Sequence, residues 1–402
     1  MSQKILIVGG GFAGLWSALG AARVLDNNGG SADVDITLIS PEPLLHLRPR
    51  LHEQAPHGMT TPLLPVLEAA GVRYLQGSVE RIDAGERRVD TVTADGQRQT
   101  LNYDRLVLTT GSKLHRPAVP GLEQHAHSVD QLDEAVRLDL HLARLADLPP
   151  SAARNTVVIV GGGFTGIEVA TEMPERLRKV FGQDARFNVI VVDRGGEIGA
   201  ELGAGPRPAI TQAFRELGVE AVLSTAVTAV DADGVTTSDG QRIEANTVIW
   251  TGGMRASALT EQLPAQRDVL GRVRTDRDLR VAGAADVFAA GDVALAQTDD
   301  EGNHALMSCQ HAIDMGRYAG HNVAADLLGL PTLHYKQPFY VTCLDLGAWG
   351  AVYTEGWQRE VKMAGADAKA LKVKINTQWI LPPLASRSAT LAAADPQRSV
   401  VA

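Results

Sequence analysis

With 402 residues, the chain is long enough for two or three domains. Its 45% hydrophobic and 21% charged residues are typical of a globular protein, whereas a formal net charge of −9 and 4% aromatic residues argue against a general affinity for nucleic acid. The two cysteines, Cys309 and Cys343, lie far apart without a CxxC motif, so we expect neither a disulfide framework nor a metal site. No apolar run approaches the ~18 residues of a membrane-spanning helix, and the N-terminus is not typical of a signal peptide.

The first 40 residues have the pattern of a strand, a glycine-rich turn, a helix and a second strand. Residues 4–8 are an apolar run of strand length, and residues 9–14 read Gly-Gly-Gly-Phe-Ala-Gly. A helix-like segment follows to Leu25, and a second apolar run occupies residues 35–39. This order predicts a βαβ unit.

The same order recurs about 150 residues later, which is an internal repeat. Residues 156–160 lead into Gly-Gly-Gly-Phe-Thr-Gly at 161–166, then into a helix-like stretch and the strand-like residues 188–193. Each copy also has a hairpin-like Asp-Gly-Gln-Arg before an apolar strand that ends at glycine. We therefore predict an α/β fold with two Rossmann-like dinucleotide-binding domains, followed by a C-terminal region rich in strands and helices.

The glycines have different tasks in a GxGxxG motif. The first makes a tight turn, the second lets a pyrophosphate approach the backbone, and the third allows the helix to pack closely on the strand. These tasks fall to Gly9, Gly11 and Gly14 in the first copy and to Gly161, Gly163 and Gly166 in the second. Two tight turns without a ligand are the alternative, but two copies in one repeat favour two dinucleotides.

The residue after the second strand of each unit distinguishes the two sites. Asp193 is placed to accept hydrogen bonds from a ribose and to repel a 2′-phosphate, which favours NADH over NADPH, although Arg194 beside it could soften the discrimination. In the first unit Ser40 and Glu42 hold this place and could meet a ribose. A capped turn between two prolines is the alternative for these two residues.

These motifs resemble those of the flavoproteins with two dinucleotide-binding domains, and among them the type II NADH dehydrogenases, over about residues 3–355. The resemblance implies FAD in the first unit and NADH in the second, with Asp292 in the late Gly-Asp turn reaching back to the FAD. It implies a split FAD-binding domain at 1–120 and 271–335, an inserted NADH-binding domain at 121–270, and a C-terminal region at 336–402. The residues that we predict at the two cofactors are Gly9, Gly11, Phe12, Ala13, Gly14, Ser40, Glu42, Arg48, Pro49, Thr110, Gly111, Gly161, Gly163, Thr165, Gly166, Asp193, Gly253, Gly291, Asp292, Gln310, His311 and Ala312.

Cysteine placement excludes two relatives within this superfamily. A disulfide reductase would carry a CxxxxC on the helix after the first glycine motif, and residues 15–25 contain no cysteine. Sulfide:quinone reductases need a redox cysteine pair, one member of it in the middle of the chain, which Cys309 and Cys343 do not match. We interpret both as buried free cysteines; a proximal pair that bridges the flavin face is the alternative.

Two residues are predicted to act in catalysis. Glu168 lies in the first turn of the second helix, where the resemblance places it at the contact between flavin and nicotinamide; the alternative is a carboxylate that only complements the helix dipole. Gln310 is kept from an Ala-Gln-x-Ala-x-Gln-like motif of quinone-reducing relatives, and could bond a quinone carbonyl or the flavin pyrimidine. Cys309 and Asp314 replace the first alanine and the second glutamine of that motif. His311 could donate protons, or be a hydrogen-bonded helix histidine.

The C-terminal segment is basic within an acidic chain. Residues 357–402 contain seven lysines and arginines and three acidic residues, a net charge of +4. Leu371, Ile375 and Trp379 recur at four-residue spacing within residues 362–381. This is typical of a helix on an anionic membrane surface, or of one docked on its own domain or across a homodimer interface. We expect disorder beyond Pro382-Pro383.

Three functions are compatible with these patterns. The favoured one is an FAD enzyme that oxidises NADH and passes electrons to a quinone, in the cytoplasm and peripherally at the inner face of the membrane. The second is a soluble NAD(P)H-dependent flavoprotein reductase that serves a protein or small-molecule partner. The third is a redox-responsive interaction module that binds NADH tightly and oxidises it slowly.

Overall fold

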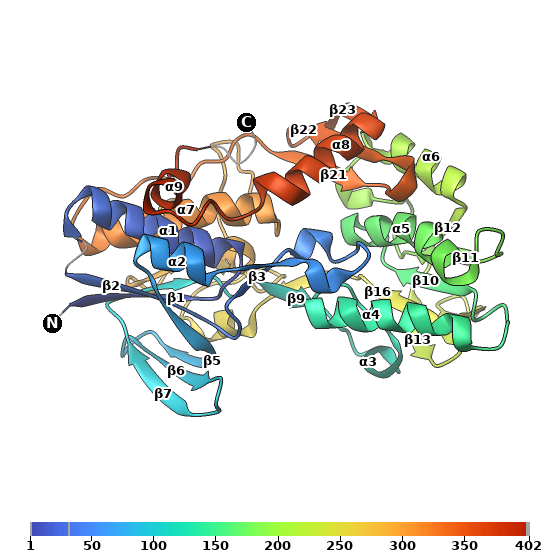
Figure 1. Cartoon of the computed structure of the whole chain (residues 1–402), viewed down its shortest axis with the longest axis horizontal. Coiled ribbons are helices and arrows are strands. Elements are labelled where there is room, and N and C mark those ends of the chain that lie inside the picture. Colours follow the sequence, from blue (N-terminus) through green and yellow to red (C-terminus); the bar gives the residue numbers. More distant parts are fainter. Residues whose placement is uncertain (1, 31–32, 399–402) are drawn as a thin grey trace.

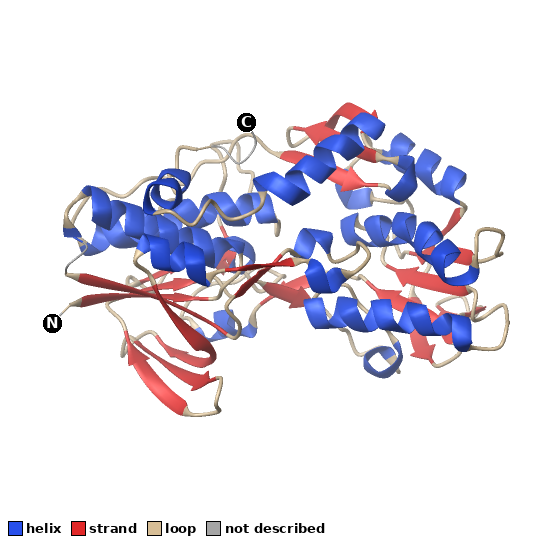
Figure 2. Ribbon diagram, in the orientation of Figure 1, coloured by secondary structure: helices blue, strands red, loops and turns tan. Residues whose placement is uncertain are grey.

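A computed structural model describes residues 2–30 and 33–398. The chain forms two halves, each with helices packed on a mainly parallel sheet, and the C-terminal strands and helices lie along one side of both (Figures 1 and 2). The predicted α/β fold is confirmed.

The first half is built on a seven-stranded sheet with the order β19-β8-β1-β2-β5-β6-β7. Its first five strands run parallel, and β5 continues into an antiparallel excursion through β6 and β7. The bounds are β1 Gln3–Val8, β2 Val34–Ser40, β5 Arg73–Asp83, β6 Arg88–Thr93, β7 Arg98–Asn102, β8 Arg105–Leu108 and β19 Val287–Ala289. Since β19 pairs with β8, the chain returns to the first sheet after making the whole second half.

The second half repeats this plan on a smaller scale. Its four parallel strands have the order β12-β11-β10-β16, and an antiparallel sheet of β13, β14 and β15 corresponds to the excursion of the first half. The bounds are β10 Thr156–Val160, β11 Asn188–Val192, β12 Val219–Val222, β13 Val227–Asp231, β14 Gly234–Thr237, β15 Arg242–Glu244 and β16 Thr247–Trp250. The internal repeat of the sequence is therefore a structural repeat.

Two long helices cover the first sheet. Figure 1 shows α1 (Phe12–Asn27) and α7 (Cys309–Leu327) side by side over it, with α2 (Leu64–Ala70) beside them. Gly320 allows this close approach, because a Cβ atom there would lie 2.1 Å from the carbonyl oxygen of Ser17. On the second sheet lie α4 (Leu132–Arg144), α5 (Phe164–Phe181) and α6 (Arg207–Leu217). Helix α5 is continuous through Pro174.

Three pairs of short strands lie outside the main sheets of the described residues. Strand β9 (Ser112–Leu114) pairs with β17 (Met254–Ala256), and β3 (Leu44–His46) pairs with β4 (Thr60–Pro62). The short helix α3 comprises Leu122–His125, and the two-residue strands β18 (Val273–Arg274) and β20 (Ala294–Leu295) pair with each other.

The C-terminal region forms a small antiparallel sheet and a helix that crosses between the halves. The sheet comprises β21 (Val341–Asp345), β22 (Ala351–Glu355) and β23 (Glu360–Gly365), followed by α8 (Ala366–Lys374) and a π-helical turn at Ile375–Trp379. Two members of the apolar stripe contact the protein: Ile375 packs on buried core residues, and Trp379 lines the cleft described below. The arrangement matches the docked-helix alternative.

The expected disorder beyond Pro383 is wrong for the described residues up to 398. Helix α9 (Arg387–Ala393) packs against α1 and α2, and Ser386 caps its first turn. Ala393 and Ala394 are buried in the core, and two ion pairs join the segment to α1: Arg387 with Asp26 at 2.6 Å and Asp395 with Arg23 at 2.7 Å. Residues 399–402 lie outside the described residues. No helix in the described part of the chain is long and apolar enough to cross a membrane.

Candidate active-site cleft

A single large cleft of about 1650 Å³ extends between the two halves. Its walls carry both glycine-rich loops and residues of the C-terminal region. This volume exceeds the ~300–1,000 Å³ of an ordinary small-molecule pocket. The cleft is therefore large enough for two dinucleotides.

The first glycine loop has the backbone that a dinucleotide requires. Gly9 has a φ of +116°, and a Cβ atom there would lie 2.4 Å from the carbonyl oxygen of Thr109. A Cβ atom on Gly14 would lie 1.8 Å from the carbonyl oxygen of Gly9, so only glycine permits this contact between helix and strand. Gly11 has open space beside it and no side-chain cap, which leaves the N-terminus of α1 accessible to an anion.

The second loop repeats this geometry, but a side chain of the protein bonds the N-terminus of its helix. Gly161 has a φ of +114°, and a Cβ atom on Gly166 would lie 1.8 Å from the carbonyl oxygen of Gly161. The carboxylate of Glu201 accepts a hydrogen bond of 2.9 Å from the backbone N–H of Phe164, in the first turn of α5. This side chain holds the place where a pyrophosphate would meet the helix N-terminus. Sequence reasoning missed Glu201, because it lies in a loop with no motif.

The predicted ribose-contacting residues lie at the ends of the second strands. The Asp193 carboxylate accepts the backbone N–H groups of Gly162 at 2.5 Å and Gly195 at 2.6 Å. In the first half, the Ser40 hydroxyl donates to the carbonyl oxygen of Glu42 at 2.8 Å. This bond forms the capped turn that the sequence offered as the alternative to a ribose contact. All three predicted residues, Asp193, Ser40 and Glu42, nevertheless line the cleft.

A polar network fixes Asp292 on the cleft wall. The hydroxyl of Ser112 donates to Asp292 Oδ2 at 2.6 Å, and Arg48 lies between Asp292 and Asp130. Burial alone would lower the pKa of Arg48. The charges of Asp130 and Asp292 outweigh this effect and hold the pKa above its ordinary value. The predicted cofactor residues Arg48 and Asp292 are thus brought together from positions 244 residues apart.

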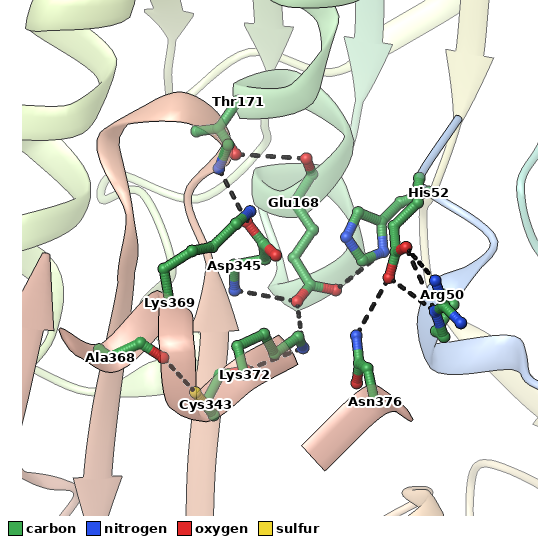
Figure 3. Close-up of polar contacts among 12 residues, drawn as sticks. Arg50, His52, Glu168, Thr171, Cys343, Asp345, Ala368, Lys369, Lys372 and Asn376 are labelled. Atoms are coloured by element: carbon green, nitrogen blue, oxygen red, sulfur yellow. Dashed lines mark hydrogen bonds and ion pairs between the residues drawn. The ribbon is translucent and has the colours of Figure 1, made fainter. Parts of the chain in front are cut away.

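Glu168 belongs to a buried ionic cluster rather than to an exposed helix end (Figure 3). Its Oε1 accepts hydrogen bonds from Lys372 Nζ of α8 at 2.8 Å and from the backbone N–H of Asp345 at 3.0 Å. Its Oε2 lies 3.6 Å from His52 Nδ1. Burial alone would lower the pKa of Lys372. The charge of Glu168 outweighs this effect and holds the pKa above its ordinary value. Sequence reasoning missed Lys372 and His52 as neighbours of Glu168.

Gln310 also faces the cleft. Its Nε2 atom is buried without a hydrogen-bond partner among the described residues. Its neighbour His311 does not line the cleft: it bonds Ser308 Oγ at 2.9 Å and stacks on Tyr340, the hydrogen-bonded helix histidine of the alternative interpretation. Burial lowers the pKa of His311 to about 3, which disfavours a role as proton donor.

Cys309 and Asp314, the two residues that differ from the motif of quinone-reducing relatives, have different surroundings. Asp314 is turned away from the cleft and pairs with Arg317 at 3.0 Å, so it does not alter the cleft wall. Cys309 and Cys343 do line the cleft as free thiols. Burial raises the pKa of both thiols to about 11, so neither thiolate is available at neutral pH.

The cleft brings together nearly all of the predicted site residues. Gly14, Gly166 and His311 do not line it, and the two glycines serve the helix contacts instead. The remaining predicted residues line it: Gly9, Gly11, Phe12, Ala13, Ser40, Glu42, Arg48, Pro49, Thr110, Gly111, Gly161, Gly163, Thr165, Glu168, Asp193, Gly253, Gly291, Asp292, Gln310 and Ala312.

The residues of the first half fit a flavin dinucleotide. Gly11 and Gly111 have open space where a side chain would stand. The hydroxyl of Thr110 and the amide nitrogen of Gln310 are buried without partners among the described residues. Since buried polar groups are rarely left unsatisfied, these atoms indicate a polar ligand in the cleft.

Comparison with known proteins agrees with this geometry. The chain is 48% identical to an NADH dehydrogenase-like protein of Mycobacterium tuberculosis over 98% of both chains. It is 30% identical to the demethylphylloquinone reductase of Synechocystis, covering 87% of this chain and 86% of the relative. Its fold matches the NADH complex of NDH2 from Plasmodium falciparum with a TM-score of 0.78 and 16% identity over 98% of both chains.

A family model extends this likeness over most of the chain. The model of the pyridine nucleotide-disulphide oxidoreductases matches residues 3–316, which include both glycine loops and the Gly-Asp turn. Membership implies a flavoprotein that binds FAD and NAD(P)H. The chain belongs to the pyridine nucleotide-disulphide oxidoreductase family and is an NADH dehydrogenase-like flavoprotein oxidoreductase.

Proposed function

We propose that this protein oxidises NADH through FAD and passes the electrons to a quinone-type acceptor. The observation that carries the proposal is the buried pair of Glu168 and Lys372, placed where the two halves and the C-terminal helix meet on the cleft wall. A charged pair desolvated at a ligand-binding cleft is typical of a functional site. The domain boundaries and residue roles predicted above are part of this proposal.

Bound FAD supplies the hydride and electron chemistry, and the protein supplies position and electrostatics. The N-terminus of α1 would hold the FAD pyrophosphate, while Asp292 and Gln310 would bond its sugar chain and ring. Asp193 selects NADH by its charge. Glu168, fixed by Lys372 and the Asp345 N–H, orients the nicotinamide amide.

The cleft wall supports a quinone rather than a sulfur compound as the acceptor. Tyr340, Ile375, Trp379 and Ile380 of the C-terminal region contribute aromatic and apolar surface to the wall. Both cysteine thiols are kept protonated by burial, which disfavours thiol chemistry. The Synechocystis relative is named for its action on demethylphylloquinone, a quinone.

The test is anaerobic stopped-flow spectroscopy in two steps. NADH is first mixed with the protein, and the reduced flavin is then mixed with a soluble naphthoquinone. Fast reduction followed by fast reoxidation supports the proposal. Reoxidation by the quinone no faster than by oxygen would contradict it, and would favour the alternative of a reductase that serves another partner.

A further inference from the structure

The glycine loop on the NADH side of the cleft presents no cation. A dinucleotide pyrophosphate carries two negative charges, whereas the N-terminus of a helix supplies only about half a positive charge. Residues 161–166 contain neither lysine nor arginine. Any cation that meets the pyrophosphate therefore comes from another segment of the chain. This inference rests on the oxidation of NADH proposed above.

Four lysine and arginine side chains on the cleft wall make no ion pair among the described residues: Lys113, Arg194, Arg255 and Arg359. The first three are exposed, whereas Arg359 is half-buried. The Arg359 guanidinium lies over the ring of Tyr340, 5.6 Å from its centroid. A guanidinium that stacks on a ring keeps the N–H groups at its edge free, and these can bind a phosphate with two parallel hydrogen bonds. Arg359 is therefore a positioned cation with free donors.

Both the ring below Arg359 and the backbone of Arg359 are fixed by packing. Tyr340 stacks on Trp357, with 4.8 Å between ring centroids, and on His311 of α7 at 5.0 Å. Arg359 has a φ of +53°, a left-handed conformation that residues with a side chain rarely adopt. Its carbonyl oxygen would lie 2.4 Å from a Cβ atom on Gly205, so its backbone packs tightly against that loop.

Strand β21 extends to the end of the molecule's second half where α5 begins (Figure 1). The Asp345 N–H bonds Glu168, and a Cβ atom on Gly347 would lie 2.1 Å from the carbonyl oxygen of Thr171. Residue numbers thus increase in the same direction along β21 and α5. Tyr340, which comes just before β21, therefore lies at the N-terminal end of α5.

The turn that carries Arg359 lies at the same end of α5. The Gly356 N–H donates to the carbonyl oxygen of Tyr340 at 2.8 Å, so the turn between β22 and β23 is next to Tyr340. The contact of Arg359 with Gly205 joins this turn to the loop of Glu201, whose carboxylate bonds the first turn of α5. Burial raises the pKa of Tyr340, the charge of Arg359 opposes this rise, and the charge of Glu201 adds to it. Arg359 and the N-terminus of α5 therefore face the same part of the cleft.

We propose that Arg359 binds the pyrophosphate of NADH opposite the N-terminus of α5. Once the Glu201 carboxylate is displaced, the helix N–H groups and the guanidinium meet the phosphates from two sides. The C-terminal sheet lies outside the predicted NADH-binding domain at 121–270, and through Arg359 it contributes to the NADH site.

The test measures binding of NAD⁺ and of ADP-ribose to the FAD-loaded protein by calorimetry. ADP-ribose has the same pyrophosphate but no nicotinamide. In Arg359→Gln both ligands should bind about tenfold more weakly, since a hydrogen bond to a charged group is lost at a half-buried site. Arg359→Lys should keep part of the affinity, because it keeps the charge. Arg215→Gln is the matched control, since Arg215 is an exposed arginine of α6 that does not line the cleft.

Two further readouts distinguish a phosphate contact from a structural role. In Arg359→Gln, the NADH concentration that half-saturates flavin reduction should rise about tenfold while the limiting rate stays unchanged, because a remote binding contact is lost. The difference in affinity between wild type and Arg359→Gln should also shrink at high salt, because salt screens a contact between partly exposed charges.

The outcomes separate the role of Arg359 from the proposed function. A wild-type protein whose flavin is not reduced by NADH contradicts the proposed function itself. A wild-type protein that reacts with NADH, with ADP-ribose bound as tightly by Arg359→Gln as by Arg215→Gln, overturns the role of Arg359. A loss of affinity that is equal at low and high salt also overturns it, since Arg359 would then support Tyr340 or stack on a base. If Arg359→Gln does not fold, Arg359→Asn decides in its place, because asparagine tolerates the left-handed backbone.

Discussion

Glu201 shows that the nicotinamide side of the cleft already has an anion at its helix terminus. Its carboxylate bonds the Phe164 N–H at the start of α5, and a Cβ atom on Gly163 would lie 2.6 Å from it. A dinucleotide pyrophosphate needs the same N–H groups and the same positive end of the helix dipole. We therefore expect NADH to displace the Glu201 carboxylate from this N–H group.

We expect Glu201→Gln to strengthen NADH binding about two- to fivefold, since a charge at a helix terminus is worth ~0.3–1 kcal/mol. Titration of the protein with NADH or NAD⁺ by calorimetry, at low and high salt, measures this. Glu216→Gln on α6 is a control, because Glu216 is exposed and bonds only Gln212 among the described residues. Weaker binding in Glu201→Gln would mean that Glu201 holds the ligand and does not compete with it.

The Glu168–Lys372 pair combines a structural and a chemical role, which substitutions can separate. Removing one member of a buried ion pair leaves an uncompensated charge and costs about 3–5 kcal/mol. We expect Glu168→Gln to lower both the melting temperature and the rate of flavin reduction by NADH. In the double variant Glu168→Gln/Lys372→Met, the melting temperature should largely recover while flavin reduction stays slow. Equal destabilisation in the single and double variants would show that the pair does not stabilise the fold.

At the scale of elements, the contact between α1 and α7 depends on small residues. Gly320→Ala places a methyl group 2.1 Å from a backbone oxygen of α1, so the two helices must move apart. We expect a loss of about 1–3 kcal/mol in the free energy of unfolding, measured by chemical denaturation. Gly85→Ala is the matched control, since its nearest neighbour would lie at 3.7 Å. A stability equal to that of the control would mean that the two helices separate without cost.

Helix α7 contacts the tail through Arg317, and Arg317 is paired with a carboxyl group whose pKa is shifted. Arg317 bonds both Asp314 and the carbonyl oxygen of Arg398, and burial raises the pKa of Asp314 to about 7. Between about pH 4 and pH 7 the unfolded chain has lost this proton while the folded protein keeps it. The folded state thus binds more protons in this window, and stability falls as the pH rises through it.

We therefore expect the melting temperature of the wild type to fall, relative to that of Asp314→Asn, as the pH increases from about 4 to about 7. Thermal unfolding of both proteins at pH 4.5, 6.0 and 7.5 checks this. A constant difference between the two would mean that Asp314 is ionised throughout.

For the whole molecule, the sequence was sufficient to predict those elements whose structure depends on a local residue pattern. The glycine loops, their strands and the repeat have short-range signatures, since apolar runs, turns and helix starts are local. Lys372 and His52 could not be predicted as partners of Glu168, because the contact with Lys372 spans 204 residues and no spacing rule reaches that far. The tail was misjudged because its alanine- and serine-rich composition has no strong periodic pattern, whereas Ala393 and Ala394 are buried in the core and ion pairs connect the tail to α1.

The return of β19 to the first sheet also has a consequence for the order of assembly. Strand β8 ends at Leu108 and its neighbour β19 begins at Val287. A ribosome that adds ~5–20 residues per second needs roughly 10–35 s between them. The four strands of the second sheet are all synthesised by Trp250, within that interval. During translation we therefore expect the second sheet to form first, while the outer edge of β8 stays unpaired until β19 has been synthesised.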